Sequence, residues 1–269
     1  MGGLIKVGFG LLVLALALIG VSYSMLRAEG MHAGARPERR AQGSETRVLT
    51  GGITSVDLSG PIDLTLRYGP TPSMTVKGEA RLLPNIETVQ QGDELHIGVT
   101  GMVLHHRQPL QAVLVLPNVA RISIEGSGNS TVTGMSGDKI SVQQSGSGNV
   151  QFNGRYQHVE AALRGSGNLE LNVGNCDEVS LNQESSGHML VLGSARKLSV
   201  SKQGSGEFDG RHLRADEVEL TQTGSGDSVV LAREKVMVQM AGSGDVRVRG
   251  GPRVQTVERT GSGEVTFRD

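Results

Sequence analysis

Hydrophobic residues alternate with polar ones along most of the chain, and glycine interrupts the alternation at regular intervals. Around the Gly-Ser-Gly triplet that begins at Gly146, Ile140 and Val142 stand six and four positions before it, and Val150 and Phe152 stand four and six positions after it. Most other copies of the triplet carry apolar residues at the same offsets. A spacing of two residues is the period of a β-strand and not of a helix. The pattern predicts a repeated unit of strand, Gly-Ser-Gly corner, strand and second turn.

The triplet recurs with a nearly constant period, and only the copy Ser185-Ser186-Gly187 is degenerate. The eight copies start 18 to 20 residues apart, at Gly126, Gly146, Gly165, Ser185, Gly204, Gly224, Gly242 and Gly261. Two short strands cannot bury an apolar face alone, whereas stacked units bury a continuous core. An antiparallel hairpin array would alternate the chemistry of successive corners, but here the corners are alike.

We therefore predict an all-β fold, a single-stranded, right-handed parallel β-helix with coils of 18–20 residues. The hand follows from the usual chirality of parallel connections. Eight coils at about 4.8 Å each give a rod about 35–40 Å long. Glycine flanks the corner serine because tight corners require a positive φ or a close backbone approach. Since the period varies by only two residues, we expect the second turn to absorb the differences in length.

Residues 48–125 lack the triplet but show a weaker form of the same pattern, whereas residues 126–269 carry the regular repeats. Val56–Leu66 reads as strand, glycine corner at Gly60, and strand, and Asp93–Ile97 follows Gly92 in the same way. We expect this region to start the same β stack and to cap it.

The first 26 residues are typical of an export signal. Lys6 precedes an apolar stretch, Val7–Val21, and small residues at Ser22 and Ser24 fit a cleavage site. The alternative is an uncleaved membrane anchor, because residues 4–26 are long enough to span a bilayer. Residues 27–47 are polar and read as a flexible tether. The single cysteine, Cys176, excludes an intramolecular disulfide and is interpreted as a small residue of a turn.

Composition narrows the classes of function. The 269 residues carry 26 basic and 27 acidic side chains, so the chain lacks the excess basic charge of a nucleic-acid binder. It contains no Trp, 3 Tyr and 4 Phe, which disfavours a module that stacks sugars or bases on aromatic rings. The 39 glycines follow no three-residue period, which excludes collagen.

The order of the N-terminal motifs resembles a known family. Gly60-Pro61-Ile62-Asp63-Leu64, Asp93-Glu94-Leu95-His96-Ile97 and Leu116-Pro117-Asn118-Val119 precede repeated Gly-Ser-Gly-Asn/Asp corners. Together they resemble the head GIN domain family, whose members are described as autotransporter adhesins, over most of residues 50–265. The resemblance implies an exported bacterial β-helical domain with no established activity.

The residue after each triplet forms a column of candidate ligands. These residues are Asn129, Asn149, Asn168, His188, Glu207, Asp227, Asp245 and Glu264. The asparagines are expected to stack as an amide ladder. Glu207, Asp227 and Asp245 are weak candidates for a calcium site, and the alternative is a solvated rim of corner residues.

Two positions before the triplet, Gln144, Gln183 and Gln222 recur every 39 residues. If their side chains point inward, they need hydrogen-bond partners.

No cluster predicts catalysis or a cofactor. A β-helical polysaccharide lyase or hydrolase needs grouped carboxylates in a walled cleft, and the second turns here are short. His105-His106 has no carboxylate at motif spacing.

We predict a non-catalytic scaffold of the cell envelope, in the periplasm or at the cell surface, with the carbohydrate-active enzyme as the alternative. Its expected partner is an envelope glycan, a protein or another solenoid, met through outward residues such as Thr131, Gln151, Glu170 and Arg247. Membrane contact is expected only through residues 4–26.

Overall fold

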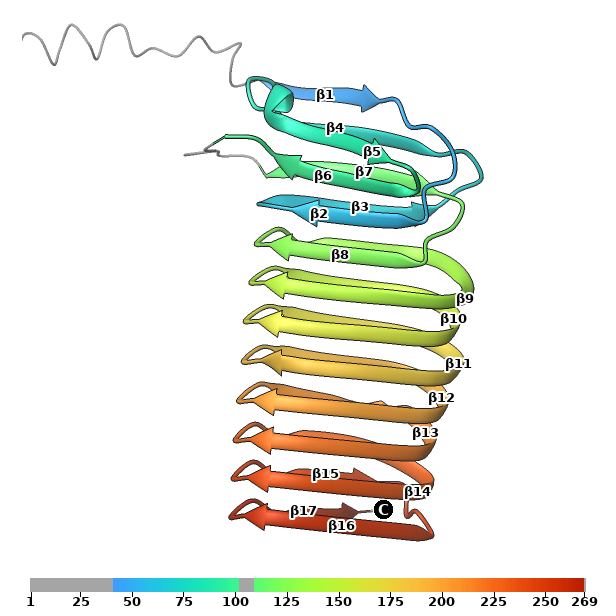
Figure 1. The fold of residues 1–269 in the computed structure, drawn as a ribbon, viewed down its shortest axis with the longest axis vertical. Coiled ribbons are helices and arrows are strands. Elements are labelled where there is room, and N and C mark those ends of the chain that lie inside the picture. Colours follow the sequence, from blue (N-terminus) through green and yellow to red (C-terminus); the bar gives the residue numbers. More distant parts are fainter. Residues whose placement is uncertain (1–40, 102–108, 269) are drawn as a thin grey trace, which may run out of the picture.

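The chain forms a right-handed β-solenoid whose coils stack in one straight column (Figure 1). The structure is a computed structural model and describes residues 41–101 and 109–268. The strands of this part all belong to one 17-stranded sheet, and the only helical segment among them is a short 3-10 turn, η2 (Leu83–Asn85). This part of the chain contains no helix that is long and apolar enough to cross a membrane.

The regular part confirms the predicted parallel stack. Its strands are β8 (Arg121–Gly126), β9 (Ser130–Gly146), β10 (Asn149–Gly165), β11 (Asn168–Ser185), β12 (His188–Gly204), β13 (Glu207–Gly224), β14 (Ser228–Gly242), β15 (Val246–Arg249), β16 (Val254–Gly261) and β17 (Val265–Arg268). Each coil pairs in parallel with the next, and the corner glycines face one another, as in Gly126 with Gly146 and Gly146 with Gly165. The corners therefore form a single column, which is the left edge of the stack in Figure 1.

The second turn is wider than expected. From β9 to β14, each strand continues through this turn as one curved segment of 15 to 18 residues. The breaks in register lie in this arc, for example between Asn153 and Gly154 and between Gly210 and Arg214. The prediction that the second turn absorbs the differences in coil length is confirmed.

The two glycines of a triplet are needed for different reasons. Gly146 has a φ of 132°, a conformation that side chains rarely allow. Gly148 lies outside that region, but a Cβ there would stand 2.0 Å from the carbonyl oxygen of Gly128 in the coil above. Close stacking of the corners therefore excludes a side chain at the third position, whatever the dihedral angles.

The core is a set of apolar columns inside the coils, at the offsets that the sequence predicted. Two of its members, Val142 and Phe208, are fully buried. Phe152 and Phe208 lie over the glycines two residues further on, because a Cβ on Gly154 or Gly210 would stand 2.6 or 3.0 Å from the neighbouring ring. These glycines make room for the two rings.

The N-terminal region supplies one coil of the stack and its cap. Its strands are β1 (Gln42–Arg47), β2 (Ser55–Ser59), β3 (Ile62–Tyr68), β4 (Ser73–Glu79), β5 (Ile86–Gln91), β6 (Glu94–Val99) and β7 (Leu110–Leu116). Strands β2 and β3 flank the corner at Gly60 and pair in parallel with β8 and β9, as expected for a first coil. On their other side they pair with β6 and β7.

Two sequence expectations are wrong in this region. Asp93–Ile97 does not follow a corner, because Gly92 and Asp93 form a two-residue hairpin loop between the antiparallel strands β5 and β6. Residues 42–47, assigned to the tether, form β1, which pairs antiparallel with β4 and covers its edge. An uncovered edge would leave a row of backbone groups unpaired. The export signal, residues 27–40 of the tether and His105-His106 lie outside the described residues.

Candidate functional site

The predicted column after the corners is a hydrogen-bonded ladder. Oδ1 of Asn129 accepts the backbone amide of Asn149 at 3.2 Å and its side-chain amide at 2.9 Å. Nδ2 of Asn168 donates to Oδ1 of Asn149 at 2.8 Å, and Oδ1 of Asn168 accepts the amide of His188. The ladder starts one coil earlier than predicted, since Oδ1 of Asp63 accepts the amide of Asn129 at 2.8 Å. Asn and Asp suit this column because their short side chains reach one coil down.

The three weak calcium candidates lie in this same column, but their groups are already engaged. Oδ1 of Asp227 accepts the amide of Asp245 at 2.9 Å, and Oδ1 of Asp245 accepts the amide of Glu264 at 3.0 Å. Glu207 faces His188, with Oε2 3.5 Å from Nδ1. Within residues 41–101 and 109–268, no three His, Cys, Asp or Glu side chains converge so as to hold a metal ion. The acidic column acts first as a link between coils.

The side chains two positions before the triplets point inward, and the amide nitrogens of the glutamines find partners there, whereas the side-chain oxygens of Gln144 and Gln183 are buried without a hydrogen bond. Nε2 of Gln222 donates to the carbonyl of Gly226 at 2.8 Å, and Nε2 of Gln183 donates to that of Gly187 at 2.9 Å. Gln144 makes the equivalent bond. Each bond closes a corner from inside the core, which explains the 39-residue recurrence seen in the sequence.

Lys202, two positions before the corner at Gly204, occupies the same inward column and carries a buried charge. Its side chain is 2 % exposed, and Nζ donates to the carbonyl of Gly226 in the coil below. Burial lowers the pKa of Lys202 to about 8, although the nearby carboxylates of Asp227 and Glu207 act in the opposite direction. The ammonium group therefore already supplies a cation close to the proposed calcium ligands.

We define the outbound face as the strand segments that leave the corners and the inbound face as those that run into them. The structure places Gln151 and Glu170 on the outbound face as neighbours, with Nε2 of Gln151 3.5 Å from Oε2 of Glu170. Thr131 and Arg247 lie in the same outward row, further along the stack. A shallow recess on this face is lined by Asn149, Gln151, Asn168, Glu170, His188 and Leu190.

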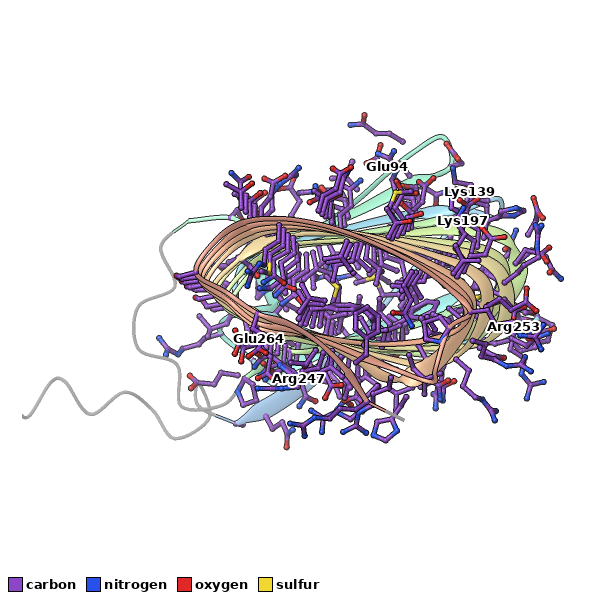
Figure 2. The ribbon with its side chains drawn as sticks, turned by 90° about the horizontal axis from the view of Figure 1, so that it is seen from below. Glu94, Lys139, Lys197, Arg247, Arg253 and Glu264 are labelled. Carbon is purple, nitrogen blue, oxygen red and sulfur yellow. The ribbon has the colours of Figure 1, made fainter. Side chains whose placement is uncertain are left out.

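The inbound face carries a charged groove that sequence analysis missed. Seven positions before successive corners stand Lys139, His158, Glu178, Lys197, Glu217 and Lys235. Each pairs in register with the next, and the charges alternate from Glu178 onward. Nζ of Lys139 lies 2.7 Å from Oε1 of Glu160, and Nζ of Lys197 lies 3.8 Å from Oε2 of Glu219. Figure 2 shows Lys139 and Lys197 on the side of the coil opposite Arg247 and Glu264. The sequence signal that could have revealed this groove is the recurrence of titratable residues seven positions before successive corners.

Two recesses follow this column. The upper one is lined by Asp138, Lys139, His158, Glu160, Glu178 and Ser180, together with the backbone at Val159. The lower one is lined by Lys197, Glu217, Glu219, Lys235 and Met237, with Val218 between them. Both are dominated by hydrogen-bonding groups of either charge. We call the two recesses together the charged groove.

One cluster contains the residue types of a Ser-His-Asp triad. On β2 and β6, Nδ1 of His96 lies 2.8 Å from Oδ2 of Asp57. A Cβ on Gly98 would stand 3.0 Å from Nε2 of His96 and 2.8 Å from Oγ of Ser59. Among the described residues, no hydrogen bond joins Ser59 to His96, so the base does not engage the hydroxyl as a nucleophile's base does. The cluster does not support the enzyme alternative.

Cys176 lies in the second turn, as predicted, but its side chain points inward. Its Sγ lies 3.4 Å from the carbonyl oxygen of Ser194. Burial, and to a smaller extent the charge of Asp177, raises the pKa of the thiol to about 11. A reactive cysteine requires a lowered pKa, so Cys176 is a packing residue.

With the corners, the ladder and both faces described, comparison with known proteins gives the family. The profile of a family described as putative auto-transporter adhesin, head GIN domain, matches residues 53–252. The chain belongs to this family. The matched residues include the first coil, most of the cap and nearly all regular coils, which agrees with the resemblance seen in the sequence. No curated protein sequence matches the chain.

Solved structures share the fold of this head GIN domain. A putative adhesin from Parabacteroides distasonis has a TM-score of 0.78 at 20% identity, over 85% of this chain and 97% of that one. A putative adhesin from Parabacteroides merdae has a TM-score of 0.77 at 18% identity, over 85% and 96%. A second Parabacteroides distasonis protein, described as a putative lipid binding protein, has a TM-score of 0.72 at 21% identity, over 85% and 97%.

Proposed function

We propose that this head GIN protein is an exported, non-catalytic scaffold of the bacterial envelope that binds a glycan in the charged groove of its inbound face. The observation that carries the proposal is the in-register column of alternating charge, flanked by recesses lined with carboxylates, ammonium groups and a hydroxyl. The adhesin description of the family supports a binding role.

The chemistry of the groove favours a glycan over a protein. Sugar hydroxyls donate and accept hydrogen bonds, and Glu160, Glu178 and Ser180 offer acceptors beside the donor Lys139. A protein interface has a desolvated core rich in aromatic residues, which the lining of this groove does not provide. Successive coils repeat the pattern about every 4.8 Å, so an extended polymer would meet equivalent groups along the stack.

The same groups explain why the site binds rather than cleaves. Oε1 of Glu160 already accepts from Nζ of Lys139 at 2.7 Å, so this carboxylate is engaged in an ion pair and does not stand free in the groove. The groove runs along an open strand face. We propose that the protein acts in the periplasm or at the cell surface, carried there by its N-terminal signal or held by it as an anchor.

The test is a glycan array probed with the purified full chain. We expect retention of envelope glycans by the native protein and at least a tenfold loss with Glu160→Ala combined with Glu178→Ala. Gln151→Ala on the outbound face is the matched control and should retain binding. Equal loss in the control, or binding that survives the double substitution, would contradict the proposal.

A further inference from the structure

The outbound face carries a charge pattern that runs across its width. Each outbound segment starts with a corner-column residue, and in five of the eight coils the residue four positions later complements it. In three coils the two are an acid and an arginine, Glu207 with Arg211, Asp245 with Arg249, and Glu264 with Arg268. In two upper coils both are amides, Asn149 with Asn153 and Asn168 with Asn172.

These residues point the same way but cannot pair within one strand. Side chains four positions apart on a β-strand share a face and are separated by about 13 Å. The acids thus form one column along the corner edge. Arg249 and Arg268 lie in register in a second column parallel to it, whereas Arg211 lies at a break in the register between β12 and β13. Figure 2 shows Glu264 on the same side of the coil as Arg247, which stands between the two columns.

The lower arginines lack compensation inside the chain. Arg249 and Arg268 are exposed and stand directly opposite each other in paired strands β15 and β17. Like charges in that position repel. No ion pair involves either residue within residues 41–101 and 109–268, whereas Arg211 is held by Asp209 at 2.8 Å. A partner that brings carboxylates to this column would remove the repulsion.

We propose that the outbound face is a self-association surface, on which a second copy packs face to face about a two-fold axis parallel to the solenoid axis. This rotation exchanges the two edge columns, so the acids of each copy meet the arginines of the other. It also brings Asn149 opposite Asn153 and Asn168 opposite Asn172 of the second copy. A symmetric interface needs such self-complementarity, and this face supplies it in register in the coils of Asn149, Asn168, Asp245 and Glu264.

The central row between the two columns faces its own copy in this arrangement. Leu190 would pack against its equivalent and contribute apolar contact, whereas Val229 is already covered within the chain, with 4 % of its surface exposed. Glu170 and Arg247 would also meet their equivalents, which costs stability, although Arg247 is 3.8 Å from Asp227 and partly neutralised.

Eight coils of about 4.8 Å and a width of about 16 Å give roughly 600 Å² of interface per copy, at the lower end for specific interfaces. The association is therefore weak and sensitive to salt. The inbound face, with its charged groove, stays open.

The test is sedimentation velocity of the full chain in mild detergent, with a matched pair of charge reversals. Glu264→Arg and Arg268→Glu each place like charges across both symmetric contacts, so each variant alone should lose at least tenfold in association constant. An equimolar mixture of the two restores opposite charges at both contacts and should form the dimer again. Arg164→Glu on the inbound face is the control and should associate like the native chain. High salt should weaken the native dimer.

Several outcomes would overturn the proposal. A native chain that stays monomeric at high concentration has no such interface. Association that survives both reversals belongs to another surface, including the N-terminal apolar segment. Retention of the monomer on a sulfated polysaccharide resin, abolished by Arg268→Glu, would assign the arginines to an anionic polymer instead. Because glycan binding is read on the other face, either proposal can fail while the other holds.

Discussion

Oδ1 of Asp227 accepts the backbone amide of Asp245, 2.9 Å away in the next coil. Three earlier steps of the column, from Asp63, Asn129 and Asn168, repeat this bond from a side-chain oxygen to the following corner amide. The column chosen in the sequence as a place for cation ligands is therefore also the seam that holds successive corners together.

Replacing the acceptor should weaken this seam. We expect Asp227→Ala to lower the free energy of unfolding by about 1 kcal/mol, because the amide of Asp245 loses its partner. Asp227→Asn keeps the oxygen and should remain within about 0.5 kcal/mol of the native protein. Urea denaturation of both variants checks this. If Asn were as damaging as Ala, the negative charge and not the acceptor would be what matters.

Calcium should not be required for folding. The carboxylates of Asp227 and Asp245 are used by backbone amides, and the buried ammonium of Lys202 lies nearby. We expect millimolar Ca²⁺ to leave the melting temperature unchanged in differential scanning calorimetry. A rise of many degrees that disappears in the double variant Asp227→Ala, Asp245→Ala would show a calcium site instead.

Gly167→Val should be among the most damaging substitutions in the chain. The sequence argument rested partly on a positive φ, which Gly167 does not have. Crowding remains as the cause, since a Cβ would stand 2.1 Å from the carbonyl of Gly148 and 2.5 Å from Nε2 of Gln144. We expect a loss of more than about 3 kcal/mol or an insoluble product.

Thr131→Val is the matched control for the corner substitution. Its side chain points outward from β9, so stability should change by less than about 0.5 kcal/mol. Urea midpoints of the two variants make the comparison. Equal tolerance at Gly167 and Thr131 would contradict the close approach of successive corners.

Lys202→Met should stabilise the protein at neutral pH. Leu163 and Met240 already occupy the equivalent position in other coils, and Gly226 keeps its bond from Gln222. Folding lowers the pKa of Lys202 from 10.5 to about 8, so its buried charge opposes folding fully below pH 8. That cost fades as the pH rises from about 8 to 10.5, where the folded form has lost the proton.

The pH dependence separates charge from shape in this prediction. We expect Lys202→Met to gain about 1–2 kcal/mol at pH 7 and the gain to shrink above pH 8, as measured by urea denaturation across that range. Subtracting the native curve at each pH removes the contributions of Cys176 and Tyr156, which also titrate at high pH. A gain that stays constant up to pH 10.5 would mean that improved packing, and not the charge, is responsible.

The regular coils were predictable because their determinants are local. The glycines around Ser147 and the apolar residues Val142 and Val150 repeat at fixed offsets, so one coil specifies the next. The inward side chain of Gln144 was noticed as a pattern, but its bond to Gly148 depends on how the corner closes.

The N-terminal region and the faces were less accessible. Whether Glu94 continues a coil or forms a hairpin depends on a two-residue loop and on β2, which lies 39 residues away in register. Residues 42–47 form the strand β1 because they pair with the edge of β4. No sequence feature near Gln42 predicts that this edge is available. The charged groove arises from side chains whose spacing matters only once the coils are stacked.

The position of β2 between β6 and β8 has a consequence for how the chain folds. A regular coil finds its neighbour 18 to 20 residues away, whereas Ser55 pairs with Glu94 and Arg121, which are 39 and 66 residues away. Closing the longer loop costs about 1 kcal/mol more in chain entropy than closing a regular coil. The first strands made during synthesis must therefore wait for distant segments, Glu94 for pairing within the cap and Arg121 for joining the regular stack. The regular coils, whose partners are local, should pair faster than the N-terminal region.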